Sequence, residues 1–437
     1  MSTQIKLSEV ISALSYALDI TEGQPEGHSA RSCMLGMRIA KEIGLGPDES
    51  SALFYALLLK DLGCSSNARK VCYLFGADDR ATKRYLKTAD WTRAIAGGDE
   101  QSPSGVPNLR KEAKELFELR CDRGATIARE LEFPELTADA IHSLDEHWDG
   151  QGYPDSLVGE EIPLLARILG VSQTVEVFIN ECGVDAAYAI ARDRSGTWFD
   201  PDLVKALDAF RNDAEFWKCY FSERAAAGTA IFEPKDRLLV ADEDRLDRIA
   251  AGFSKVIDAK SPWTYRHSEG VAKISVGIAQ LMCFNAQDTR YLHRAALVHD
   301  VGKLGISNLI LDKPGKLTPE ETTEMRRHAL YTEQILSRVD GFKQLADLAA
   351  SHHERLDGKG YHRGLVASQL STSVRILAVA DMYEALTAKR PYRHDLTNEE
   401  AMAILWRDVG AGICPAVFDA LKVHIARGGY VPEPLAA

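Results

Sequence analysis

The chain contains an internal repeat, and this repeat constrains its fold more than any other feature of the sequence. The segment Asp149-Gly-Gln-Gly-Tyr153 is followed by Arg167-Ile-Leu169. The related segment Asp357-Gly-Lys-Gly-Tyr361 is followed by Arg375-Ile-Leu377 at the same distance. One short motif can match by chance, but preserved spacing between two motifs indicates that a larger unit was copied.

A second pair of motifs repeats upstream of the first. His28-Ser29 precedes Asp61-Leu-Gly63. His267-Ser268 precedes Asp300-Val-Gly302 by the same number of residues. We therefore predict a tandem duplication, in which 437 residues form two domains of one fold, each with its own core.

Apolar residues recur at three- and four-residue spacing along most of the chain, which is the pattern of amphipathic helices. Clear examples are Arg31–Ile43, Arg245–Lys260, Glu269–Met282 and Glu320–Val339. The sequence has no convincing alternating run, and Leu238–Ala241 is a short ambiguous stretch. The predicted fold class is all-α, with two tandem helical bundle domains.

The repeat also sets the expected domain bounds. We predict a first copy at residues 1–210, a linker at 211–244 and a second copy at 245–437. The first copy carries an insertion after Asp61, which we assign to the polar stretch Ala96–Pro107. The linker is charged and Ala-rich, and its aromatic cluster Phe216–Phe221 is expected to pack against a domain.

Composition excludes several classes of function. A net charge of −12 argues against binding to a DNA or RNA polymer, although a local basic pocket can still hold a small anion. Apolar stretches such as Ala52–Leu59 are far too short to span a bilayer. The eight cysteines are scattered without a Cys-x-x-Cys pair, and the N-terminus lacks the order of a signal peptide. We expect a cytoplasmic protein with free thiols and no membrane contact.

The second copy contains a set of histidine and aspartate residues that suits a metal centre. Imidazole and carboxylate groups bind borderline transition metals such as iron and manganese, and mixed sets are typical of dinuclear hydrolases. An Asp beside a His on a helix can bridge two metals while the His binds one of them. The candidate ligands are His267, His299, Asp300, His328, His352, His353 and Asp381.

Each of these residues also has a simpler interpretation. A lone histidine on a helix is usually a surface residue or a satisfied core residue, and an isolated His-Asp dipeptide means little. The full set is harder to explain in this way, because its members lie among apolar helical residues and buried polar groups are costly. We therefore predict metal binding.

The motifs around these residues resemble the HD-GYP subgroup of HD-domain phosphohydrolases. The resemblance runs almost without a break from Asp258 to Arg393. Members of this family degrade cyclic di-GMP, or in some cases cyclic GMP-AMP, with two or three metals that are often iron or manganese. The motifs are His299-Asp-Val-Gly-Lys303, Leu311-Asp-Lys-Pro-Gly-Lys-Leu317, His352-His-Glu354, Asp357-Gly-Lys-Gly-Tyr361 and Arg390-Pro-Tyr-Arg393.

The resemblance implies a role for each motif residue. The seven candidates above would be the metal ligands, with Asp300 as the bridge. Lys303 would lie near the scissile phosphate and offset charge in the transition state. Tyr361, Arg390 and Arg393 would hold the nucleotide, although a solvated surface is the simpler interpretation of the two arginines.

Two positions depart from the family pattern. His362 stands where a proline usually completes the Gly-Tyr-Pro signature, and we expect a freer loop with an exposed His362. Trp263 stands where members with three metals carry a Glu. This favours a site with two metals, which makes linearisation of the substrate more certain than complete hydrolysis to mononucleotides.

The first copy lacks most of the ligand set. His28 and Asp61 are retained, but Lys60 replaces His299 and Arg120 replaces His328. Cationic side chains repel a divalent ion, so this copy is expected to hold no metal. The other replacements are Leu144 and Asp145 for the paired histidines, Gln173 for Asp381 and Cys64 for Lys303.

These features predict a phosphodiesterase that opens a cyclic dinucleotide, either cyclic di-GMP or cyclic GMP-AMP, to the linear dinucleotide. The alternatives are a receptor that binds the dinucleotide without turnover and an enzyme for another phosphoester. The first copy is expected to serve structure or interaction. The sequence leaves open whether it binds a ligand, pairs two chains into a homodimer, engages a regulatory partner or restrains the active half.

Overall fold

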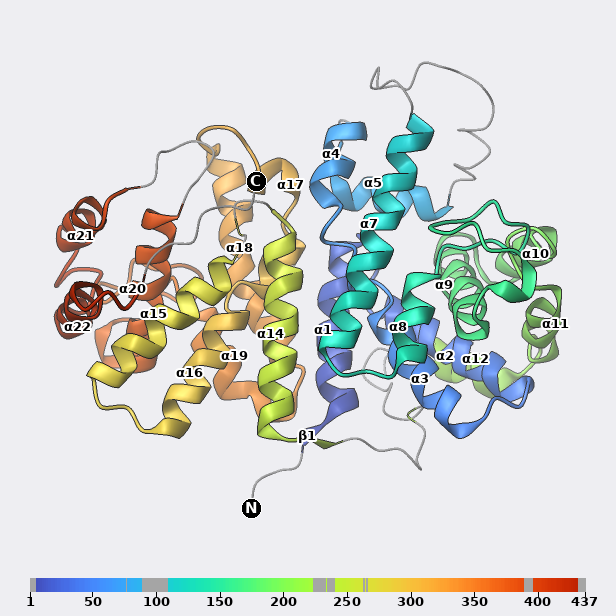
Figure 1. Ribbon diagram of the computed structural model, residues 1–437, viewed down its shortest axis with the longest axis horizontal. Coiled ribbons are helices and arrows are strands. Elements are labelled where there is room, and N and C mark those ends of the chain that lie inside the picture. The colour runs from blue at the N-terminus through green and yellow to red at the C-terminus, as the bar shows by residue number, and fades with distance from the viewer. Residues whose placement is uncertain are drawn as a thin grey trace. The chain divides into compact units, whose positions relative to one another are not determined.

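The computed structural model describes residues 5–75, 77–88, 109–222, 233, 240–261, 264, 266–388 and 396–430. The chain divides into two compact units, Met1–Arg245 and Leu246–Ala437. The described residues are overwhelmingly helical, which confirms the all-α prediction (Figure 1). Within them, the one sheet pairs β1 (Ile5–Lys6) with β2 (Val240–Ala241), so the ambiguous stretch Leu238–Ala241 ends in a two-residue strand.

The first unit consists almost entirely of helices in its described residues. The insertion assigned to Ala96–Pro107 lies outside the described residues, but two helices that precede it, α4 and α5, are described. The helices are α1 (Leu7–Thr21), α2 (His28–Glu42), α3 (Pro47–Leu59), α4 (Ala68–Phe75), α5 (Asp79–Thr88), α7 (Leu109–Glu130), α8 (Glu135–His142), η1 (Gly159–Glu161), α9 (Leu164–Cys182), α10 (Val184–Asp193), α11 (Pro201–Ala209) and α12 (Ala214–Tyr220).

The second unit repeats most of this order. Its first helix, α14 (Glu243–Ala259), crosses the boundary between the units. The elements after it are α15 (His267–Leu281), α16 (Ala286–Val298), η5 (Val301–Gly305), α17 (Asn308–Leu311), α18 (Pro319–Leu336), η6 (Asp340–Phe342), α19 (Lys343–Ala350), η7 (Ala367–Gln369), α20 (Thr372–Thr387), α21 (Asn398–Trp406) and α22 (Pro415–Ala426).

The two units pack their helices in the same way. In the first, α2 packs against α3 and α9, and α8 packs against α3, α7 and α9. In the second, α15 packs against α16 and α20, and α19 packs against α16, α18 and α20. A short bridge closes the Gly-rich loop in both, between Asp149 and Val158 and between Asp357 and Val366. The duplicated sequence therefore corresponds to a duplicated fold.

Capping residues fix the start of three helices that carry or precede candidate ligands. Thr318 and Glu321 form a reciprocal capping box at α18, and Pro319 occupies its first turn. The Asn285 side chain caps α16, and the Ser371 side chain caps α20. Because each side-chain oxygen satisfies a free backbone N–H, each helix begins at a defined residue and its ligand faces a defined direction.

A glycine after the His-Asp pair permits a close contact between helices. A Cβ at Gly302 would collide with the carbonyl oxygen of His328 on α18. A Cβ at Gly63 would collide in the same way with the carbonyl of Arg120 on α7. This shared contact supports the alignment of Arg120 with His328.

The segment predicted as the linker includes an ordered helix. In α12, Phe216 is buried and packs edge-on against Phe210 with ring centroids 5.0 Å apart. Tyr220 is also buried, whereas Phe221 is 63% exposed. Part of the aromatic cluster thus packs onto the first unit, while the exact domain bounds stay a prediction.

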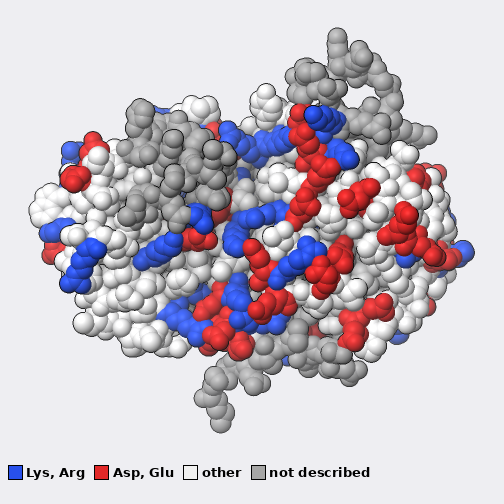
Figure 2. All heavy atoms as spheres, viewed as in Figure 1, with Lys and Arg blue, Asp and Glu red and all other residues white. Residues whose placement is uncertain are grey.

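Basic and acidic side chains are interspersed over the face of the molecule shown in Figure 2. Such a mixed surface differs from the continuous basic stripe that binds nucleic-acid polymers. Across the described part of the chain, the helices are too short or too polar to span a bilayer.

Candidate metal centre

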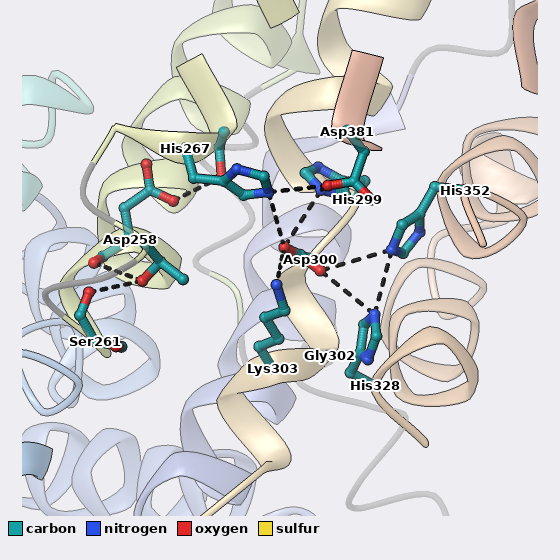
Figure 3. Close-up of polar contacts among 12 residues, drawn as sticks. Asp258, Ser261, His267, His299, Asp300, Gly302, Lys303, His328, His352 and Asp381 are labelled. Carbon is teal, nitrogen blue, oxygen red and sulfur yellow. Dashed lines mark hydrogen bonds and ion pairs between the residues drawn. The ribbon is translucent and has the colours of Figure 1, made fainter. Parts of the chain in front are cut away.

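The seven candidate ligands converge from five places in the second unit. His267 begins α15, His299 and Asp300 follow α16, and His328 lies on α18. His352 and His353 follow α19, and Asp381 lies on α20. Figure 3 shows the side chains of His267, His299, His328, His352 and Asp381 around the carboxylate of Asp300.

The two oxygens of Asp300 face different groups of histidines. Its Oδ2 lies 3.4 Å from Nε2 of His267 and 3.3 Å from Nε2 of His299. Its Oδ1 lies 3.5 Å from Nε2 of His328 and 3.7 Å from Nε2 of His352. A carboxylate with one oxygen toward each of two ligand groups has the arrangement of a bridge between two metal ions.

Asp381 and His353 complete the two groups. Asp381 Oδ1 lies 3.2 Å from Nε2 of His267, and its Oδ2 lies 3.7 Å from Nδ1 of His353. Potential ligand atoms of His267, His299 and Asp381 lie within 4.8 Å of one another, as do those of His328, His352 and His353. Each group is compact enough to surround one ion.

Backbone carbonyls orient three of the histidines. Nδ1 of His299 donates to the carbonyl of Ala296 at 2.7 Å. Nδ1 of His328 and of His352 bond in the same way, at 2.6 Å, to the carbonyl three residues earlier. In the neutral ring the proton then lies on Nδ1, and Nε2 is directed to the centre as an acceptor, as is typical of metal-binding histidines.

Glu384 orients the fourth histidine, and sequence reasoning missed this residue. Its carboxylate contacts Nδ1 of His267 across the α15–α20 interface, so that Nε2 of His267 faces Asp300. The first unit contains the equivalent pair, His28 and Glu176. Glu176 precedes Glu384 by the spacing that relates the Gly-rich loops, and this match could have revealed it.

Burial sets the protonation of the histidines around Oδ1 of Asp300. Burial lowers the pKa of His328 to about 3 and the pKa of His353 to about 4. Both imidazoles are therefore neutral at pH 7, the form that binds metal. Burial also acts to lower the pKa of His299, but the carboxylates of Asp300 and Asp381 together outweigh it and raise this pKa to about 9.

Several buried atoms at the centre have no hydrogen-bond partner in the part of the chain that the structure describes. They include Nε2 of His267 and His299 and Oδ1 of Asp300. Unpaired buried polar atoms are rare in proteins and need an explanation. A divalent ion would satisfy all three atoms at once, and both their chemistry and their convergence fit such an ion.

Lys303 and Tyr361 lie beside these ligands. The Lys303 ammonium contacts Oδ2 of Asp300, and the ring of Tyr361 lies 4.3 Å from the ring of His353. The guanidinium of Arg326, which sequence reasoning did not select, lies over the Tyr361 ring at 5.1 Å. The other two predicted nucleotide ligands, Arg390 and Arg393, and the variant position Trp263 lie outside the described residues.

A family model described as the HD domain matches residues 103–203 and 252–417 of this chain. The chain belongs to the HD-domain family. The second range includes all seven candidate ligands, and the first begins after His28, Lys60 and Asp61. The resemblance predicted from the motifs is confirmed.

Proteins similar to this HD-domain chain include one matching nearly its full length. It is 42% identical to a Vibrio cholerae protein named 3'3'-cGAMP-specific phosphodiesterase 3, over 95% of this chain and 94% of that one. A Thermotoga maritima cyclic di-GMP phosphodiesterase is 38% identical over 41% of this chain and 49% of its own length. A crystal structure of a V. cholerae cyclic GMP-AMP-specific phosphodiesterase superimposes with a TM-score of 0.68 at 37% identity, covering 97% of this chain and 98% of that one.

The loop after the paired histidines departs from the HD-GYP signature, but side-chain contacts hold it to α18. Nε2 of His362 lies 2.9 Å from Oε2 of Glu333 on α18. The guanidinium of Arg363 bonds the same carboxylate, with Nη2 2.5 Å from Oε1. His362 is partly exposed, and these contacts replace the rigidity of proline with ion pairs. These contacts restrain the loop, and the sequence prediction of a freer loop did not include them.

The corresponding place in the first HD unit is filled by cations. The ammonium of Lys60 contacts Asp61, and the guanidinium of Arg120 contacts Asp145. One group of potential ligands remains close together there, namely Glu22, Asp61 and Cys64. Burial raises the pKa of the Cys64 thiol well above its usual value, so this thiol stays protonated and is a poor ligand.

The same His–Glu contact occurs in both HD units, so its loss can be compared between them. We expect Glu384→Gln to lower metal content and turnover by about 10–100-fold, the usual cost of losing a group that orients a ligand. Glu176→Gln removes the same contact in the first unit and is expected to leave both quantities unchanged. Metal analysis and steady-state kinetics on the two variants check this, and equal losses would contradict it.

Proposed function

We propose that the second unit is a metal-dependent phosphodiesterase that hydrolyses one 3'–5' linkage of a cyclic dinucleotide and releases the linear dinucleotide. The observation that carries this proposal is the position of Asp300, whose two oxygens each face a separate group of histidines. Two adjacent ions are the arrangement used by many phosphoester hydrolases.

The proposal includes two divalent ions, iron or manganese. His267, His299 and Asp381 would hold one ion, His328, His352 and His353 the other, and Asp300 would contact both. Bound ions of this kind act as Lewis acids on the phosphodiester and lower the pKa of water. All eight cysteines of the chain are free, which agrees with a reducing, cytoplasmic setting.

The side chains around the ligands would position and neutralise the substrate. Lys303 would offset the negative charge that develops on the phosphoryl oxygens. Tyr361 presents a half-buried ring beside His353, where a nucleotide could pack. Arg390 and Arg393 stay predicted phosphate contacts.

Among cyclic dinucleotides, we propose 3'3'-cyclic GMP-AMP as the preferred substrate. The support is the relative named for this specificity, which is similar to the chain along nearly its full length. Relatives named for cyclic di-GMP align over less than half of the chain. Within the same proposal, the first unit is not catalytic, because cations occupy the places of its histidines.

The test is an assay with both substrates. The purified chain, loaded with Mn²⁺ or Fe²⁺, is incubated with 3'3'-cyclic GMP-AMP or cyclic di-GMP, and products are separated by chromatography. We expect the linear form of cyclic GMP-AMP to appear faster than that of cyclic di-GMP. Metal-loaded protein that binds either compound without consuming it would instead be a receptor and would overturn the enzyme proposal.

A further inference from the structure

The first unit contains a pocket that the proposed catalytic function does not use. The space between its lining side chains, open solvent included, is about 830 Å³. Tyr153 and Gln173 line it, and they correspond to Tyr361 and Asp381 of the second unit. Val71 of α4 and Lys83 of α5 also line it, and they come from the region that follows Asp61, where only the first unit carries an insertion. The pocket thus lies where the other unit has its metal centre.

Flat aromatic rings form much of its wall. Phe117 and Tyr153 stack with centroids 5.5 Å apart and an angle of 13° between their planes. On another side, Trp198 stacks on His147 with centroids 4.1 Å apart. Aromatic surfaces of this kind favour planar ring ligands such as nucleobases.

The charged side chains in the pocket are already paired. Arg120 contacts Asp145, and Nζ of Lys83 lies 3.3 Å from Oε1 of Glu22 and donates to the carbonyl of Cys64 at 2.5 Å. The pocket therefore offers no surplus positive charge, and a phosphate would have to separate an existing ion pair. An uncharged ligand suits it better.

Two buried amide oxygens in the pocket have no hydrogen-bond partner among the described residues. They are Oε1 of Gln173 and Oδ1 of Asn67, from side chains of residues only 8% and 7% exposed. A buried acceptor without a donor is destabilising, so both atoms would gain from a ligand N–H. Amino and ring N–H groups of a purine are donors of this kind.

From these features we propose that the pocket of the first unit binds the purine base of an uncharged nucleoside, stacked on the aromatic wall and donating N–H groups to Gln173 and Asn67. The site is separate from the metal centre, and it involves no bond breaking. It gives the first unit a ligand-binding role that does not depend on the proposed hydrolysis.

The first experiment compares ligands and leaves the protein unchanged. The full chain, kept free of metal with chelator so that turnover is absent, is titrated by calorimetry with guanosine, purine riboside and ribose 5-phosphate. We expect guanosine to bind at least tenfold more tightly than purine riboside, which has the ring without the N–H donors, and ribose 5-phosphate not to bind. Equal affinity for the two nucleosides, or preference for ribose 5-phosphate, would overturn the proposal.

Hydrogen exchange then locates the bound base. Guanosine is expected to slow amide exchange in peptides that contain Phe117, Tyr153 and Trp198. Gln173→Leu should remove the preference for guanosine over purine riboside, whereas Tyr361→Leu, in the matching loop of the second unit, should leave the protection of the first unit unchanged. Protection confined to the second unit would show that the base binds at the metal centre alone and would refute the site. Because the readout is binding, loss of the proposed enzyme activity would not affect this outcome.

Discussion

Replacing Asp300 by alanine is expected to abolish turnover and to empty the metal centre. The carboxylate is buried, faces histidines of both groups and is the ligand that we propose to bridge the two ions. Its loss should therefore exceed the roughly 10–100-fold penalty of removing an outer group. Elemental analysis of the purified variant and product chromatography measure the two effects.

The electrostatics of Asp300 explain why a second variant is needed. Burial acts to raise the pKa of Asp300, but Lys303 and the surrounding imidazoles together outweigh it and hold this pKa well below its usual value. Alanine removes this anion and leaves the Lys303 ammonium beside two imidazoles, so the variant could also lose stability. Asp300→Asn keeps the volume and should lose metal and activity with a smaller change in melting temperature.

A matched control exists in the first unit. The double variant Lys60→Met/Asp61→Leu removes the counterpart of Asp300 together with its paired ammonium, so no buried charge is stranded. We expect it to retain metal and turnover. Normal activity in Asp300→Ala, or loss of metal in the control, would contradict the assignment of the centre to the second unit.

The sequence was sufficient to predict the helical fold and the set of candidate ligands. Adjacent pairs such as His299-Asp300 and His352-His353 stand out in the sequence. Two neighbouring residues that can bind metal are unusual among the apolar residues of a helical core. Comparison of the two copies showed which ligand positions differ between them, and one copy alone cannot show this. Lys60 and Arg120 stand where the second copy has histidines, and these differences point to the side chains that a metal site would need.

Two glutamates that hold histidines of this region in place were not predicted, and the reason is physical. Glu384 contacts His267 across the packing of α15 against α20, and Glu333 binds His362 between a helix and a loop. Nothing within either element specifies such a partner, since both pairs depend on tertiary packing. The two short strands Ile5–Lys6 and Val240–Ala241 also lie far apart in the sequence, so their pairing could not be predicted either.

The pocket of the first unit also could not be predicted from the sequence. Sequence comparison indicates that its metal ligands were replaced, but not that aromatic rings and unpaired amides enclose a pocket in their place. Asn67, Phe117 and Trp198 come from distant segments and have no common motif. Their association is visible only after the helices are packed.

Replacing Lys303 by methionine is the second change with a large expected effect. The Lys303 side chain is partly exposed and its ammonium contacts Asp300, so it lies at the edge of the centre where substrate would enter. Loss of a fixed charge that stabilises a transition state costs about 10²–10³-fold in kcat. The first unit has Cys64 at this position, in agreement with a role that is needed only for chemistry.

The comparison of kcat, KM and metal content separates two roles for this lysine. If Lys303 acts on the phosphoryl group, Lys303→Met lowers kcat far more than it changes KM, and the metal content stays that of the unaltered chain. Lys303→Arg should restore part of kcat because it keeps the charge. Lys359→Met, in the nearby Gly-rich loop, controls for loss of a positive charge and should retain activity. A parallel fall in metal content and kcat in Lys303→Met would show instead that the lysine holds Asp300 in place, and the transition-state role would then be wrong.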